Sequence, residues 1–390
     1  MNYNIRSTLF LVLFCVLSTF AQNSTIDIAG SVTDNTEIGV PYVAVSILAR
    51  NIGTVTNEEG KFQFEIKESY LSDTLEVSSI GFETYKVVLS DYIASENKTI
   101  KLEDAISTLD EVSILLRDTR YYVKNAIKNL KENTISKPHQ LNLLYRRFSI
   151  EDNSTRFFVE HYMKVVDRGP ISLEFEKFQI LEGRKSADYR FIKQKQHVHS
   201  IKIMNKNNPL RQRTLLRKYE WKKIGDTFYD GEDVIILVGS RWKGDSLKLY
   251  IGMDTYNVYK MENSDLDAVF IYKKNSAGKL YLSYHNREWK SKKELSGEVK
   301  KYLKKKGNKI ELSYRHEMIV LGIETDKKKI KVKDSGQMDA DIGDLEVIYH
   351  PEFWKNFSSP PPTAFHKKSV EELEAVYGVP IQVQFDAVNN

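Results

Sequence analysis

Apolar and polar residues alternate in the early part of the chain. Residues 43–47 and 62–66 each place an apolar side chain at every second position, the period of a β-strand with one buried face. Residues 57–60 supply a polar turn that ends in Gly60, where a positive φ costs least. The pattern predicts a small antiparallel β-sandwich over residues 26–102.

Helical spacing of apolar residues is first convincing at residues 118–131. Val123, Ala126 and Leu130 fall on one face of such a helix, and Asp118 stands where an N-cap is needed. We therefore expect an amphipathic helix at the start of a larger C-terminal region, residues 117–390.

Aromatic-rich segments with strand-like patterns follow Pro138, and several are joined by short polar turns such as residues 275–278. The expected strands are residues 141–150, 156–166, 233–238, 247–253, 256–261, 268–273, 279–284 and 310–320. Short connections and one apolar face predict an antiparallel meander.

Helix signals return in the tail, residues 345–390. Pro351 is placed to begin a helical turn. A capping box at residues 369–372 predicts a helix that runs through Tyr377 and is ended by Gly378. We expect these helices to form a clasp that packs on the sheet.

The first residues of the chain indicate its compartment. A short basic start, an apolar run at residues 9–17 and small residues up to Ala21 predict a secretory signal peptide over residues 1–21. Cys15 is the only cysteine of the chain, so cleavage after Ala21 leaves a mature protein without disulfides. No later apolar stretch approaches the roughly 20 residues of a membrane-spanning helix. We expect an exported protein, periplasmic or associated with the outer membrane.

Basic residues cluster although the formal net charge is only +5. Residues 290–309 contain nine lysines and two glutamates, and residues 327–333 read KKKIKVK. One interpretation is peripheral attraction to anionic lipid headgroups. The other is a pair of solvated strand edges on which lysines discourage pairing with another chain. Binding of nucleic acid conflicts with export.

The turn-defining residues of the predicted sandwich carry a resemblance. Gly30, Asp34, the run 39–41, the segment 53–62 and the run 79–82 are together similar to the carboxypeptidase-regulatory-like domain, a transthyretin-like sandwich. Such domains accompany metallocarboxypeptidases and begin many outer-membrane receptors of Bacteroidota-type bacteria. Residues 103–116 resemble the linker that follows the domain in those receptors. The remaining residues are too few for a receptor barrel, so the resemblance implies an interaction or spacer module.

The predicted helix and meander carry a second resemblance. With GEDVIILVG and LKLYIGMDTYNVYKME at its centre, this region resembles the half-barrel of periplasmic lipoprotein carriers. That resemblance implies a concave apolar face that shelters an acyl chain or another envelope ligand; the alternative is a face packed shut by helices. The expected fold class is therefore mainly β, an antiparallel transthyretin/Ig-like sandwich followed by a curved, half-barrel-like sheet with a few flanking helices.

Catalytic motifs are missing from the sequence. No histidine begins the His-x-x-Glu pair of a zinc carboxypeptidase. His197 and His199 lie two apart without an acidic third ligand, and we interpret them as polar residues of an exposed strand. Gly-x-Ser-x-Gly and phosphate-binding glycine loops are also absent. We expect no enzyme, no catalytic residues and no cofactor.

Two acidic clusters remain. One comprises Asp226, Asp230, Glu232 and Asp233 around a turn, and the other comprises Asp334, Asp339, Asp341 and Asp344. The second loop, residues 334–344, offers carboxylates at alternate positions and is a weak candidate for calcium. The alternative is a solvated loop.

The sequence thus favours a non-catalytic secreted envelope protein that binds a lipid-like or envelope ligand, or docks to an outer-membrane partner through its sandwich. The alternatives are a structural adaptor of a surface or receptor complex and, third, a divergent carboxypeptidase or glycan hydrolase. The partners expected are an envelope lipid, a lipoprotein or an outer-membrane protein. Trp221, Trp242 and Trp354 are interpreted as core residues.

Overall fold

The computed structural model describes residues 24–105, 117–192, 199–241, 246–333 and 336–389. The expected signal peptide and most of the expected linker lie outside the described residues. In the part of the chain that is described, no helix has the length and apolarity needed to cross a bilayer.

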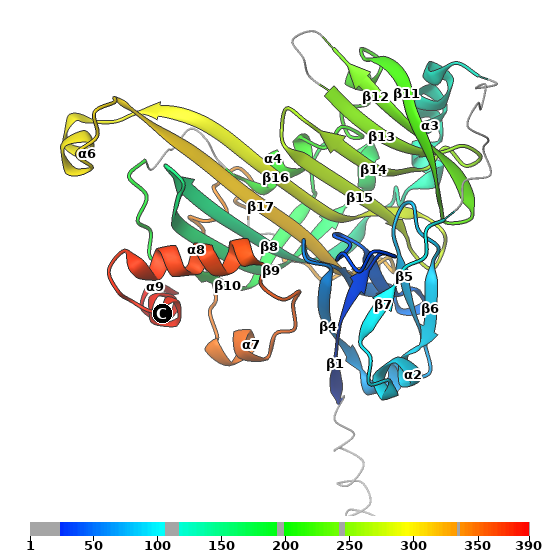
Figure 1. Cartoon of the computed structure of the whole chain (residues 1–390), viewed down its shortest axis with the longest axis horizontal. Coiled ribbons are helices and arrows are strands. Elements are labelled where there is room, and N and C mark those ends of the chain that lie inside the picture. The colour runs from blue at the N-terminus through cyan, green and yellow to red at the C-terminus, as the bar shows by residue number, and fades with distance from the viewer. Residues whose placement is uncertain (1–23, 106–116, 193–198, 242–245, 334–335, 390) are drawn as a thin grey trace, which may run out of the picture.

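The N-terminal region is a sandwich of two small sheets (Figure 1). One sheet has the order β4-β1-β7, and the other contains β3-β2-β5-β6. The strands are β1 (Thr25–Thr33), β2 (Ala44–Ile47), β3 (Ile52–Val55), β4 (Lys61–Lys67), β5 (Thr74–Ser78), β6 (Tyr85–Val88) and β7 (Thr99–Lys101), with helix α2 (Leu89–Ala94) beside β6. Val43, Val45, Phe62 and Phe64 fill the core, which confirms the sandwich expected from the alternating pattern.

A larger antiparallel sheet follows, curled into a half-barrel (Figure 1). Its order is β11-β12-β13-β14-β15-β16-β17-β8-β9-β10. The strands are β8 (His139–Glu151), β9 (Ser154–Asp167), β10 (Lys177–Lys185), β11 (Glu220–Tyr229), β12 (Glu232–Ser240), β13 (Ser246–Gly252), β14 (Val258–Asn263), β15 (Ala268–Lys274), β16 (Leu280–Glu294) and β17 (Lys309–Glu324). The curved, mainly β architecture is as expected from the sequence.

Helices cover both faces of the half-barrel. On the inner face lie α3 (Thr119–Asn133), α4 (Ile201–Lys206) and α5 (Arg213–Leu216). The outer face carries α7 (Pro351–Asn356), α8 (Ala364–Ala375) and α9 (Ile381–Asn389), whose side chains share a core with β8 and β9. The side chain of Asp118 accepts a hydrogen bond from the N–H of Arg120, the N-cap expected for α3.

The tail differs from its prediction in the extent of its helices: α8 ends at Ala375, before Tyr377, and α9 was not predicted. Helix α8 begins at Ala364, because the Thr363 hydroxyl caps it by accepting a hydrogen bond from the N–H of His366. Ser369, expected as the cap, instead lies inside the helix and is buried. The clasp itself packs on the sheet, with Leu373 and Phe385 in the outer-face core.

Strand β17 joins the two regions. It pairs with β8 along one edge, and along the other edge with β16 as far as Ile319 and then with β3 of the sandwich at Gly322. The contact with the sandwich is the pair Gly322 and Ile52. A single hydrogen-bonded sheet therefore runs from the half-barrel into the sandwich.

Candidate functional site

The inner face of the half-barrel is largely filled. Val123, Ala126 and Leu130 of α3 share one apolar cluster with residues of β11 to β17, and Ile342 and Leu345 close it from the loop that follows β17. The half-barrel resemblance left two alternatives, an open concave face for a ligand and a face packed shut by helices. The structure has the second. Any ligand site on this face therefore has to lie at its margin.

A groove lies at that margin, between α3 and the segment that leads from α5 into β11. It has a volume of about 560 Å³, within the range of roughly 300–1,000 Å³ that is usual for small-molecule sites. Its apolar floor consists of Val123, Ile127, Leu216, Tyr219 and Trp221. The indole N–H of Trp221 donates to the Leu216 carbonyl at 3.1 Å, so the floor presents the apolar ring.

The rim of the groove is basic. Arg120 and Lys124 stand on α3, and Arg217 and Lys218 stand on the opposite wall. All four are exposed, and within the described ranges none of them forms an ion pair. Glu220 is the single carboxylate among the lining residues. An apolar floor under a cationic rim matches a molecule with a hydrocarbon part and an anionic head.

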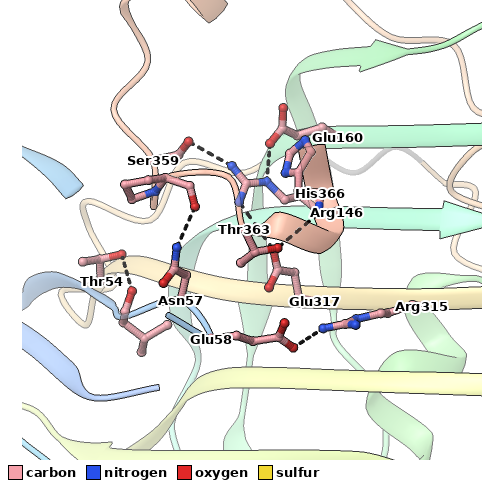
Figure 2. Close-up of polar contacts among 12 residues, drawn as sticks. Thr54, Asn57, Glu58, Arg146, Glu160, Arg315, Glu317, Ser359, Thr363 and His366 are labelled. Atoms are coloured by element: carbon pink, nitrogen blue, oxygen red, sulfur yellow. Dashed lines mark hydrogen bonds and ion pairs between the residues drawn. The ribbon is translucent and has the colours of Figure 1, made fainter. Parts of the chain in front are cut away.

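A second cleft lies where the sandwich, the outer face of the half-barrel and the tail meet (Figure 2). Asn57 of the sandwich donates to the Pro361 carbonyl at 2.9 Å, and Arg315 of β17 pairs with Glu58. The Tyr42 ring stacks on Tyr284 at 4.7 Å between centroids. Residues far apart in sequence are thereby held against one another.

An ion-pair network forms the floor of this cleft. Arg146 of β8 pairs with Glu160 of β9 and also reaches Glu317 at 3.4 Å, and Arg184 donates to Glu160 at 2.7 Å. Burial alone would raise the pKa of Glu160, but the guanidinium groups of Arg184 and Arg146 outweigh it and lower that pKa to about 2. Burial lowers the pKa of His366 to about 4, so this imidazole is neutral at pH 7.

This cleft has little room for a ligand. Its volume is about 40 Å³, enough for about one water molecule. Its charged groups already have partners, and burial lowers the pKa values of its two histidines, His316 and His366. The arrangement acts as a joint between the two regions.

A polar cluster interrupts the apolar packing of the inner face. Arg147 is fully buried and pairs with Asp341 at 2.7 Å, and its Nε and one Nη find no hydrogen-bond partner. Arg287 is 8% exposed, and within the described ranges it forms no ion pair. Burial without a carboxylate lowers the pKa of Arg287.

Four histidines border these arginines: His161, His199, His285 and His316. Burial lowers the pKa of His161 and His285 to about 4 and that of His199 to about 3. The Nε2 atoms of His285 and His316 lie 3.2 Å apart. No group of three or more ligands able to hold a metal forms among the described residues.

The candidates singled out in the sequence lie apart. His199 is buried beside Tyr314, so its interpretation as a residue of an exposed strand is wrong; His197 lies outside the described residues. Asp341 pairs with Arg147, while Asp339 pairs with Lys202 at the surface. Of the remaining acidic residues, Asp344 pairs with Arg190, Asp226 with Lys223 and Asp230 with Lys274, and Glu232 accepts from Thr255 and Tyr259. Asp334 lies outside the described residues.

Of the three tryptophans interpreted as core residues, two are buried. Trp354 packs in the outer-face core with Arg184 stacked 4.5 Å from its ring centre. Trp221 is 8% exposed and also lines the groove. Trp242 lies outside the described residues. Trp221 therefore belongs to the core and also lines the groove.

The groove itself was missed in the sequence. Its opposite wall, residues 216–221, reads LRKYEW and belongs to no predicted element. Two adjacent cations flanked by Leu216, Tyr219 and Trp221 were the available signal. Because α3 and this wall are about a hundred residues apart in sequence, the pattern alone could not bring them together.

Residues 28–114 match the CarboxypepD_reg-like domain family. The match covers the sandwich and confirms the first resemblance. It extends over less than half of the chain, and it assigns no activity to the rest. A search of curated proteins finds no match to this chain.

The C-terminal region is similar to solved half-barrel structures. An outer membrane lipoprotein-sorting protein domain from Vibrio parahaemolyticus has 8% identity and a TM-score of 0.27, covering 55% of this chain and 95% of that one. A DUF1329 family protein from Desulfovibrio piger has 10% identity and a TM-score of 0.28, covering 55% and 96%. A LolA superfamily protein from Nitrosomonas europaea has 10% identity and a TM-score of 0.21, covering 54% and 97%. Likenesses at this level say nothing about a ligand of this chain.

Proposed function

We propose that this is a non-catalytic, exported envelope protein that binds an anionic, lipid-like molecule in the groove between α3 and the segment 216–221. The observation that carries the proposal is the combination of an apolar floor with four rim cations that form no ion pair among the residues the structure describes. The hydrocarbon part of the ligand lies against Val123, Ile127 and Trp221, and its anionic head lies among the basic side chains. Export rests on the signal-peptide pattern of residues 1–21.

Quenching of tryptophan fluorescence tests the location of the ligand. We expect dibromostearate to quench the mature protein, because its bromine atoms reach Trp221 in the groove. Trp221→Phe should remove most of the quenching. Trp354→Phe is the matched control, because Trp354 lies in the outer-face core and should leave the quenching intact. Equal quenching in wild type and Trp221→Phe would place the ligand elsewhere and overturn the proposal.

Charge reversal tests recognition of the head group. Arg217→Glu combined with Lys218→Glu should weaken binding of dibromostearate about tenfold or more, since each cation near an anionic head contributes on the order of 1 kcal/mol. Lys327→Glu with Lys328→Glu makes the same change of charge at exposed residues away from the groove and should leave the affinity within about twofold. A similar loss in both variants would mean that only net charge matters.

The adaptor reading is the second candidate, and one observation favours it. Strand β6 ends its sheet without a further partner strand in the described chain, and it exposes Tyr85 and Val88. An exposed edge accepts a strand from another protein. Replacing Val88 by proline removes an N–H on the open edge of β6 and would abolish capture of such a partner, while dibromostearate binding would be unchanged.

A further inference from the structure

The end of the β16–β17 hairpin projects from the body as an arm (Figure 1). The two strands pair with each other as far as Glu294 and Lys309. The pairing of β15 with β16 ends at Arg287, and the pairing of β8 with β17 ends at Leu312. Beyond these points the arm is two-stranded, and helix α6 (Gly297–Tyr302) caps its tip.

Charge is concentrated on this tip. Residues 294–309 carry six lysines and two glutamates, a formal net charge of +4, against +5 for the whole chain. All six cations are lysines. Lysine places a point charge on a long flexible stem, which suits a diffuse anionic surface, whereas paired recognition of one carboxylate or phosphate favours arginine.

Several of these lysines are not neutralised within the protein. Lys305 pairs with Asp152, and Lys300 donates to the side chain of Asn308. Lys301, Lys304 and Lys306 are exposed, and they form no ion pair with any residue that the structure describes. The tip therefore presents free cations, arranged around a short helix, to whatever lies in front of it.

An aromatic side chain stands among the lysines. Tyr302 is 70% exposed, although one side of its ring contacts Phe191 at 5.8 Å between centroids. Tyrosine combines an apolar ring with a polar hydroxyl and is suited to the boundary between water and lipid headgroups. Charge and aromatic character thus occur together at the farthest point of the arm.

We propose that the arm tip docks on an anionic lipid bilayer, with Lys301, Lys304 and Lys306 among the headgroups and Tyr302 at the interface. The negative potential of such a membrane complements the local charge, and a surface rather than a cleft is what a projecting tip can reach. This docking concerns a different part of the molecule from the groove and does not depend on ligand binding there.

Flotation with lipid vesicles tests the docking. The mature protein should bind vesicles of phosphatidylcholine with about one-third phosphatidylglycerol, and hardly bind pure phosphatidylcholine. Raising the salt from about 0.05 M to about 0.5 M should release it, because screening shortens the range of the attraction. Lys301→Glu, Lys304→Glu and Lys306→Glu together should lower the partition coefficient at least about tenfold.

The matched control is Lys327→Glu, Lys328→Glu and Lys329→Glu, which changes net charge equally at exposed residues outside the tip. It should lower the partition coefficient by less than about threefold. An equal loss in both variants, or no binding of the wild type, overturns the proposal. Tip-dependent binding to soluble polyglutamate without binding to vesicles would assign the tip to an acidic protein and also overturn it. Tyr302→Ser should weaken vesicle binding and leave polyglutamate binding unchanged.

Discussion

Two neighbouring arginines of β8 differ in how their charge is compensated. Arg146 faces the outer side and has Glu160 and Glu317 as partners, whereas Arg147 faces the inner side with Asp341 alone. Arg287 shares that inner side without any carboxylate in the described ranges. A buried charge lacking a partner costs free energy that a hydrophobic side chain of similar shape does not.

We therefore predict that Arg287→Met stabilises the protein. The free energy of unfolding, measured with urea at pH 7, should rise by about 1–3 kcal/mol. Arg146→Met is the contrasting variant, because it leaves the buried Glu160 with fewer cations and should cost about 3–5 kcal/mol. Destabilisation by Arg287→Met would show that this guanidinium has compensating interactions in solution.

Acid should weaken the fold at pH values where the buried Glu160 below the cleft is still ionised. The pKa values of His161, His285 and His366 are lowered to about 4 by burial. The unfolded chain, with histidine pKa values near 6.5, binds protons more readily, so stability is full above about pH 6.5 and falls as the pH drops toward about 4. Each histidine contributes up to about 1.4 kcal/mol per pH unit in this window.

Urea unfolding at pH 7 and at about pH 5 checks this expectation. Glu160, with a pKa of about 2, loses its stabilising contribution as the pH falls from about 4.5 toward 2, so it adds little to the difference between pH 7 and about pH 5. His285→Gln should reduce the dependence on pH, because one buried imidazole is then missing. A free energy of unfolding that stays constant between the two pH values would contradict the prediction.

At the scale of elements, regular patterns were predicted well and irregular ones were not. Helix α3 and the strands from β12 to β17 follow apolar periodicity and clear turns, and the structure contains them all. Strands β10 and β11 escaped prediction. Residues 177–185 and 220–229 mix charged residues with apolar ones because both strands lie at the ends of the sheet and are only partly buried.

The elements that form the groove could not be paired from sequence. Helix α3 showed its apolar face plainly, and nothing in that face indicated that residues 216–221 would oppose it. The polar cluster escaped prediction for a related reason. Arg147, Arg287 and His316 come from three different strands, and only the register of β8, β16 and β17 brings them to one face. Strand registry depends on tertiary packing as much as on local pattern.

At the scale of the whole molecule, the sandwich and the half-barrel should unfold together. They share a sheet through Gly322 and Ile52, and the joint adds the Tyr42–Tyr284 stack and the hydrogen bond from Asn57 to Pro361. We predict a single calorimetric transition for the wild type, because neither region can unfold without exposing the other's contact surface.

Tyr42→Ala combined with Asn57→Ala should split this transition, with the sandwich melting first at a lower temperature. A loss of about 1 kcal/mol shifts the melting of a domain of this size by roughly 4–8 °C. Tyr85→Ala, an exposed residue of β6 away from the joint, should leave one transition. Two transitions in the wild type would mean that the joint does not couple the regions.

The position of β17 in the sheet also governs when the chain can fold. Residues 309–324 close the half-barrel against β8, whose residues 139–151 emerge far earlier, and they also complete the sheet that begins in the sandwich. Until this late segment arrives, the edges of β8 and β3 stay without their partner. Pairing across so long a stretch of chain is slow, and open edges invite aggregation. A protein built this way depends on being kept from contact with other unfolded chains until the last quarter of its own chain is available for folding.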